Sequence, residues 1–308
     1  MTRSRFAMLL SIFCFSIATA RAQAPGVPSA ETQRAPGTAQ QYLYPAMQLY
    51  LHQEYDLAID AFTKALQLDP KLASALLYRA MAYQAKGETE DAAKDYHALI
   101  EIDPRSTEAF TAHLILGGIL QGKGDLDGAL AEIEQAREIR PNAVHVYIAR
   151  GRLRQAKGDL DGALADFGEA ISLGHPSPAV LDNRGVVRTA RGDFEGAIED
   201  FTKAMELSLR EPSFMVHRGD AKNAKGDLDG ALADYNKALN WDNGYAHGLI
   251  KRGLLELTIG RNDEAQADFD IAVKLNPSLE ASMRKAIDEE KVKKKQPARI
   301  SKPPKPKK

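Results

Sequence analysis

The sequence predicts an all-α protein built as a solenoid of about seven two-helix repeats. The segment 157–167 recurs almost unchanged as 225–235, and weaker copies run 86–96, 123–133 and 191–201. The residues expected at the turns are Gln53, Gly87, Gly124, Gly158, Gly192, Gly226 and Gly260, spaced by 34, 37, 34, 34, 34 and 34 residues. A constant period near 34 is typical of arrays in which each repeat packs only on its neighbours.

Each repeat carries small and large apolar residues at constant distances from its turn. Five, nine and twelve residues after Gly158 stand Ala163, Phe167 and Ala170, which lie on one face of a helix. Seven residues before each turn stands an Ala or Gly, which allows close packing of a first helix. The turn glycine suits the left-handed residue that ends a helix, and an aspartate such as Asp159 can cap the next helix.

This pattern resembles the tetratricopeptide repeat (TPR) family over roughly 39–279. The resemblance implies a right-handed solenoid whose first helices line a concave groove, where partner peptides usually bind. It indicates a shape and not a ligand. The expected repeats, numbered one to seven, are 39–72, 73–106, 107–143, 144–177, 178–211, 212–245 and 246–279. A helix over 280–295, with Leu279, Met283 and Ile287 at i, i+4 and i+8, is expected to cap the array.

Several details depart from the regular pattern. Pro45 falls inside the first helix of repeat one, which should begin there or be kinked, because proline disrupts a helix interior. Repeat three has three extra residues, which predict a longer first helix. Glycines early in the second helices, such as Gly162, are attributed to internal duplication, with close approach of a partner as the alternative. Trp241 is expected in the core.

The ends of the chain differ from the array. Arg3 and Arg5 precede an apolar stretch, 6–20, that is short for a membrane span and is typical of a signal peptide, expected over 1–22. The alternative is an uncleaved anchor. We therefore expect a periplasmic or secreted protein. Residues 23–38 are rich in Ala, Pro, Gly and Gln and read as a flexible linker.

Charge is strongly segregated, although the chain as a whole has a net charge of −1. Residues 23–290 hold 29 basic and 42 acidic side chains, whereas residues 291–308 hold nine basic and no acidic ones. The nine are Lys291, Lys293, Lys294, Lys295, Arg299, Lys302, Lys305, Lys307 and Lys308. The segment 296–308 is expected to be a disordered tail, with binding to an anionic lipid or polymer surface as an alternative. Nucleic acid is not expected as a partner, because no aromatic residues are interleaved with these charges.

An arginine stands eight residues before the turn, and an aspartate eight residues after it, in the same five repeats. These residues are Arg79, Asp95, Arg150, Asp166, Arg184, Asp200, Arg218, Asp234, Arg252 and Asp268. Because the guanidinium fork fits a carboxylate, we expect a ladder of structural ion pairs, within a repeat or across to the next. A row of arginines that binds an anionic ligand is the alternative.

The TPR resemblance implies which residues face the concave groove. The candidate partner-binding residues are Leu43, Met47, Tyr50, Leu77, Met81, Gln84, Leu114 and Arg152. The apolar members should form one exposed strip, and such strips usually mark contact sites. The alternative is that residues 23–40 cover this strip or that it packs between first helices.

The sequence predicts neither a catalytic site nor a metal or cofactor site. No two of the seven histidines lie at i, i+4, so neither a metal site nor another cofactor is expected. Nothing resembles a nucleophile elbow or a phosphate-binding loop. The sequence favours a monomeric, non-enzymatic scaffold that binds a protein or peptide. The alternative function is an envelope-surface adaptor that acts through its basic tail.

Overall fold

The computed structural model describes residues 38–174, 176–208 and 210–295 of the 308-residue chain. The expected signal peptide (1–22), the expected linker except residue 38, and the expected tail (296–308) lie outside the described residues. Secondary structure in the described ranges is entirely helical. None of the helices described there has both the length and the apolarity that crossing a bilayer requires.

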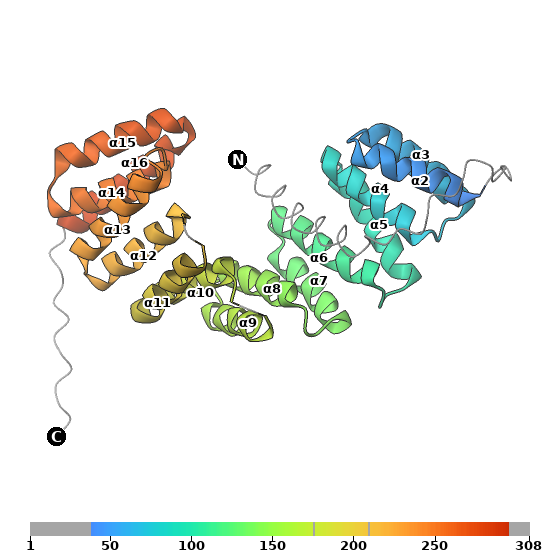
Figure 1. The fold of residues 1–308 in the computed structure, drawn as a ribbon, viewed down its shortest axis with the longest axis horizontal. Helices are drawn as coiled ribbons and strands as arrows, with labels where there is room; N and C mark the ends of the chain where they lie inside the picture. The colour runs from blue at the N-terminus through green and yellow to red at the C-terminus, as the bar shows by residue number, and fades with distance from the viewer. Residues whose placement is uncertain (1–37, 175, 209, 296–308) are drawn as a thin grey trace, which may run out of the picture. The chain divides into compact units, whose positions relative to one another are not determined.

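The helices of the described residues follow one another as seven hairpins and a final cap (Figure 1). The first and second helices of repeats one to seven are α2 (Ala39–Leu51) and α3 (Tyr55–Leu68), α4 (Ala73–Lys86) and α5 (Thr89–Ile102), α6 (Thr107–Gly122) and α7 (Leu126–Ile139), α8 (Val144–Lys157) and α9 (Leu160–Leu173), α10 (Pro178–Arg191) and α11 (Phe194–Leu207), α12 (Pro212–Lys225) and α13 (Leu228–Trp241), and α14 (Ala246–Ile259) and α15 (Asn262–Leu275). They are followed by the 3-10 turn η1 (Pro277–Leu279) and α16 (Glu280–Lys295). The predicted all-α array of paired helices is confirmed.

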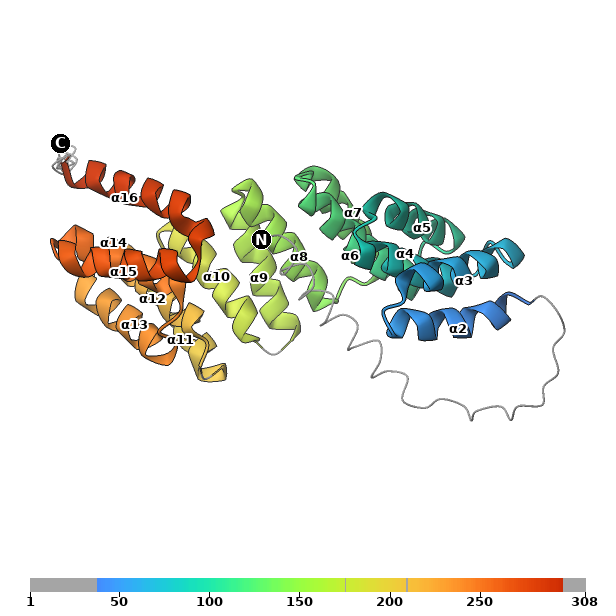
Figure 2. The same ribbon diagram turned by 90° about the horizontal axis from the view of Figure 1, so that it is seen from above.

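The chain divides into two compact units, Met1–Ala75 and Leu76–Lys308. In the first unit, α2 and α3 pack together as a hairpin. In the second unit each helix from α5 to α15 contacts the next, and the first helices α6, α8, α10, α12 and α14 also contact one another in that order (Figure 2). We call this series of five helices the first-helix row.

Packing within a repeat depends on the small residue of the first helix. A Cβ atom at Gly185 would lie 2.7 Å from the ring of Phe201, and one at Gly219 would lie 2.5 Å from the ring of Tyr235. Both rings are essentially fully buried. In repeats three to seven the large residue of the second helix therefore packs directly on a glycine of the first helix, which explains why small and large residues alternate at these positions.

The turns close as the sequence predicts. Gly158 ends α8 with φ of 82°, a left-handed conformation that glycine adopts without steric cost. Asp159 then caps α9, because its side chain accepts a hydrogen bond from the amide of Gly162. In repeat one the turn residue is Gln53, a non-glycine residue that has φ of 63°.

The early glycines of the second helices have a structural reason. In repeats three to six an aspartate caps the helix, and a Cβ atom at the glycine three residues later would lie 2.1–2.4 Å from its carboxylate. Repeats one, two and seven have Glu54, Glu88 and Arg261 at the cap, without a side-chain cap bond. Their equivalent positions hold larger residues, namely Leu57, Asp91 and Glu264. Cap and glycine therefore occur together, and neither duplication nor a partner is needed to explain the glycine.

The other irregularities are resolved as follows. Helix α2 starts at Ala39 and contains Pro45, so the expectation that it begins at Pro45 is wrong. The extra residues of repeat three lengthen its first helix, since α6 has 16 residues and α8 has 14.

The expectation that Trp241 is buried is also wrong. Trp241 is the last residue of α13 and is 42% exposed, and Leu207 and Leu275, at the same position of their repeats, are also exposed.

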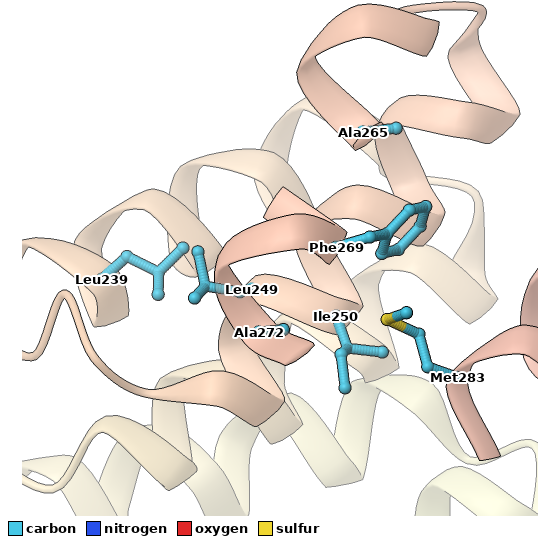
Figure 3. Packing of buried hydrophobic residues seen from close by; sticks show 7 residues of the cluster. All are labelled: Leu239, Leu249, Ile250, Ala265, Phe269, Ala272 and Met283. Atoms are coloured by element: carbon cyan, nitrogen blue, oxygen red, sulfur yellow. The ribbon is translucent and has the colours of Figure 1, made fainter. Parts of the chain in front are cut away.

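Helix α16 covers the end of the array where the sequence predicts a cap. It packs against α14, and its Met283 lies beside Ile250 and Phe269 (Figure 3). Leu279 and Ile287 are partly buried against the same cluster. The apolar face of the last repeat is therefore removed from water, as a terminal repeat requires.

Candidate functional site

Five arginines of first helices bond aspartates of the second helices of their own repeats. Arg184 donates from Nε to Asp200 Oδ2 (2.8 Å) and from Nη2 to Asp200 Oδ1 (2.6 Å). The same pairing, sixteen residues apart, joins Arg79 to Asp95, Arg150 to Asp166, Arg218 to Asp234, and Arg252 to Asp268. The hydrogen bonds to Asp200 raise the pKa of Arg184 above its usual value. The aspartates are buried, so the pairs lie inside the array and are structural.

A second cation bonds the buried aspartate in repeats four, five and six. Arg154 and Arg188 reach Asp166 and Asp200 through Nη1, and Lys222 reaches Asp234 through Nζ, each at 2.8 Å. All three cations stand four residues before the turn glycine. A basic residue at that position could therefore have predicted this second contact from the sequence.

The arginines also connect neighbouring repeats. Arg150 Nη1 donates to Glu134 Oε1 (2.6 Å), Arg218 Nη1 to Thr202 Oγ1 (3.1 Å), and Arg252 Nη1 to Asn236 Oδ1 (2.7 Å). Each acceptor lies sixteen residues before its arginine and belongs to the preceding repeat. The equivalent residue for Arg184 is Gly168, which has no side chain to accept the bond.

Repeat three has a different buried pair. Its sequence lacks the arginine and aspartate, but His113 Nδ1 lies 2.7 Å from Glu132 Oε2. His113 is buried on α6 and Glu132 occupies the aspartate position on α7. The longer α6 changes the register of its side chains, which is why the sequence pattern did not reveal the pair.

The predicted groove residues differ in exposure. Leu43 and Met81 are 9% and 8% exposed, so they cannot belong to the exposed apolar strip that the sequence suggested. Their apolar side chains are part of the core instead. The remaining candidates are partly exposed: Met47, Tyr50, Leu77, Gln84, Leu114 and Arg152. Leu114 packs in part on the core cluster of Phe110 and Ile133.

Arg152 is the most distinctive of these residues. It lies on α8, in the first-helix row, and makes no hydrogen bond or ion pair with any residue that the structure describes. Burial lowers the pKa of its guanidinium, and the charge of Asp182 on α10 only partly opposes this effect. Asp182 itself bonds His217 Nδ1 at 2.7 Å. Arg152 therefore presents donors that have no acceptor.

Further along the row, polar side chains link α10, α12 and α14. Asp220 on α12 bonds Lys251 Nζ (2.8 Å) and accepts a hydrogen bond from the hydroxyl of Tyr235 (2.7 Å). Burial, together with Asp220, raises the pKa of Tyr235. Burial lowers the pKa of His217. Its hydrogen bond to Asp182 and the charges of nearby carboxylates raise the pKa by more than burial lowers it, so the pKa lies above its usual value.

A second donor without an acceptor lies next to Asp182. The Nδ2 atom of Asn183, on α10, is buried and has no hydrogen-bond partner in the part of the chain that the structure describes. An unpaired buried donor costs free energy that an incoming acceptor can recover. Within the described residues, no group of three or more His, Cys, Asp and Glu side chains is arranged to hold a metal ion.

Comparison with known proteins gives the same architecture. The model of the tetratricopeptide repeat-like domain matches residues 57–216, and that of the tetratricopeptide repeat matches 212–245. Outer dynein arm-docking complex subunit 4 of Xenopus laevis is 33% identical over 112 residues, which are 36% of this chain and 20% of that protein. This chain therefore spans about a fifth of that relative.

Two solved structures resemble the whole array. A tetratricopeptide repeat protein from Parabacteroides merdae superposes with a TM-score of 0.66 at 15% identity, covering 82% of this chain and 98% of that one. The C-terminal part of a TPR protein from Cytophaga hutchinsonii superposes with a TM-score of 0.63 at 22% identity, covering 80% of this chain and 98% of that one. These likenesses show the fold. With the family model matching more than half of the sequence, the chain belongs to the tetratricopeptide repeat family.

Proposed function

We propose that this protein is a non-enzymatic scaffold that binds a segment of a partner protein along the first-helix row. Arrays of this family are typically interaction scaffolds, and that general role is the starting point of the proposal. The observation that carries it is the unpaired guanidinium of Arg152, with the unpaired amide of Asn183 on the next helix of the row.

The chemistry of these two side chains indicates the kind of segment that would bind. A guanidinium has five donors in a planar fork, and a carboxamide nitrogen has two. Both would be satisfied by backbone carbonyls or by a carboxylate of the partner. Leu77 and Leu114, which are partly exposed, would add apolar contact on α4 and α6.

A peptide selection tests this function. Random peptides displayed on phage are selected against the full chain, and the affinity of the enriched peptides is then measured by calorimetry. We expect Arg152→Met to weaken binding about tenfold or more, because a charge-assisted hydrogen bond is worth roughly 1.5–3 kcal/mol. Lys203→Met is the matched control, since Lys203 lies on the second helix α11 and pairs only with Glu199 at the surface. Equal losses in both variants, or no enriched peptide, would contradict the proposal.

We further propose that the protein is exported, with a signal peptide removed near residue 22. The support is the sequence of Arg3, Arg5 and the apolar stretch 6–20. Mass spectrometry of the chain produced in a bacterial host should show a new N-terminus near Gln23. An intact Met1 on a cytosolic product would exclude export.

The segregation of charge supports an alternative function as an adaptor at an anionic surface. Residues 291–308 carry nine basic and no acidic side chains, whereas the array is acidic. In sedimentation with anionic vesicles, deletion of 296–308, which removes five of the nine basic side chains, should weaken association, and added salt should also weaken it by screening. If the deletion variant sediments like the full chain, the tail is not the surface-binding element.

A further inference from the structure

The last repeat replaces a cation of the ladder with a carboxyl group. Four residues before the turn, repeats four, five and six have Arg154, Arg188 and Lys222, and each bonds the buried aspartate of its repeat. Repeat seven has Glu256 at this position, facing the buried Asp268. Where three repeats place a cation beside the aspartate, the seventh places a second acid.

Glu256 has little means of stabilising a negative charge. Glu256 is only 7% exposed, and its Oε2 atom is buried without a hydrogen-bond partner among the described residues. Asp268 keeps only one of the usual two cations, bonding Arg252 Nε and Nη2 at 2.8 and 2.7 Å. Arg252 therefore pairs with Asp268, and Glu256 has no cation bonded to it among the described residues.

The surrounding charges do not compensate for this arrangement. The strongest electrostatic influences on Glu256 come from Arg252 on its own helix, from Arg261 at the start of α15, and from Asp268 and Glu264 on α15. Burial raises the pKa of Glu256, the charge of Asp268 raises it further, and the two arginines lower it less. The protonated acid is the form that this environment favours.

We propose that Glu256 is a proton-binding site through which pH controls how firmly the last repeat and its capping helix hold together. A neutral Glu256 packs between α14 and α15 beside Asp268. When it ionises, its carboxylate repels that of Asp268, although Asp268 is paired with Arg252.

The capping helix depends on the same segment of α14. Thr258, two residues after Glu256, donates a 2.8 Å hydrogen bond from its Oγ1 to Glu290 Oε1 of α16. Leu257 packs against the cluster that contains Phe269 and Met283. Movement of α14 at Glu256 would therefore reach α16 directly.

The direction of the pH effect follows from linkage. A carboxyl group whose pKa is higher in the folded state adds stability at low pH, and this contribution is lost as pH rises from the ordinary value of 4.5 through the folded value. The last repeat should therefore loosen on a shift from acid toward neutral pH.

The test compares the full chain with its Glu256→Gln variant, which imitates the protonated side chain at every pH. Amide hydrogen exchange of 246–295, corrected for the intrinsic rate, is measured between about pH 5 and about pH 8. We expect exchange in α14–α16 to accelerate several-fold with pH in the natural chain and not in the variant. Repeats four and five serve as the internal reference.

Asp263→Asn is the matched control, because Asp263 is exposed on α15 and is not among the charges that act on Glu256, so the pH dependence should stay intact. A carbon NMR titration of the Glu256 carboxyl group in the natural chain gives a second readout that needs no variant. A titration midpoint at the ordinary value, or the same pH dependence in the natural chain and Glu256→Gln, would overturn the proposal.

Discussion

The amide of Gly162 donates a 2.9 Å hydrogen bond to Asp159 Oδ1, and a Cβ atom at Gly162 would lie 2.1 Å from the other oxygen of that carboxylate. The cap of α9 and the missing side chain at its third residue thus depend on each other. The same pairing occurs in repeats three, five and six.

Replacing Gly162 with alanine should bring no gain in stability. A helical glycine usually costs about 0.5–1 kcal/mol relative to alanine. Here the new methyl group would displace the capping aspartate, whose bond is worth about 1 kcal/mol. The loss of the cap therefore offsets or exceeds the gain in helix propensity, and the variant is at most as stable as the natural chain. Gly168→Ala, in the same helix, is the control because its Cβ would meet no atom within 4 Å, and it should gain the full amount. Urea unfolding measures both, and equal gains would refute this account.

Gly168→Glu should stabilise the array more than Gly168→Ala. Arg150 uses Glu134 as its acceptor in the preceding repeat, and Gly168 is the equivalent residue for Arg184. The new carboxylate would accept from the free Nη1 of Arg184, which should add about 0.5–1.5 kcal/mol. A double-mutant cycle with Arg184→Met isolates this coupling. If the glutamate and alanine variants are equally stable, the bond does not form.

Arg184→Met should destabilise the protein by roughly 1–3 kcal/mol, because it removes charged hydrogen bonds to a buried carboxylate. Arg188 still bonds Asp200, so the aspartate is not left bare. Replacing both arginines should cost about 3–5 kcal/mol, since an uncompensated charge then stays buried. Thermal and urea unfolding are the measurements, with Lys203→Met as the surface control. A loss of less than about 1 kcal/mol in the double variant would mean that the buried pairs are energetically unimportant.

His217 should titrate above its ordinary value of 6.5, because Asp182 bonds it. Its contribution to stability is complete below pH 6.5 and is lost as pH rises through the folded-state pKa. In Asp182→Asn, burial should dominate and the pKa of His217 should fall. Proton NMR titration of the imidazole checks both values. An unchanged midpoint in the variant would show that Asp182 does not hold the charge.

The fold could be predicted because the residue types that the packing requires recur at the same positions in seven repeats. Gly151 and Phe167 are informative together, since a ring that packs on a backbone needs both residues at a constant separation. The pairing of Arg184 with Asp200 was predictable for the same reason.

The candidate site was less accessible from the sequence. Whether Met81 is exposed depends on the packing around it, and a methionine suits a core as well as a surface. Arg152 bonds no residue that the structure describes, and Asp182 bonds His217 of another repeat, and periodicity can show neither fact. Positions where one repeat departs from the others, such as Glu256, were the best signal available.

The arginines that donate hydrogen bonds to the preceding repeat also influence where the array unfolds first. In a linear array, stability is the sum of each repeat's own stability and its coupling to its nearest neighbours. Between repeats three and seven, the described residues give such a bond at three of the four junctions, and Gly168 leaves the fourth, between repeats four and five, without it. Partial unfolding should therefore divide the second compact unit at this junction, leaving α10–α16 as a block that can stay folded while α5–α9 opens.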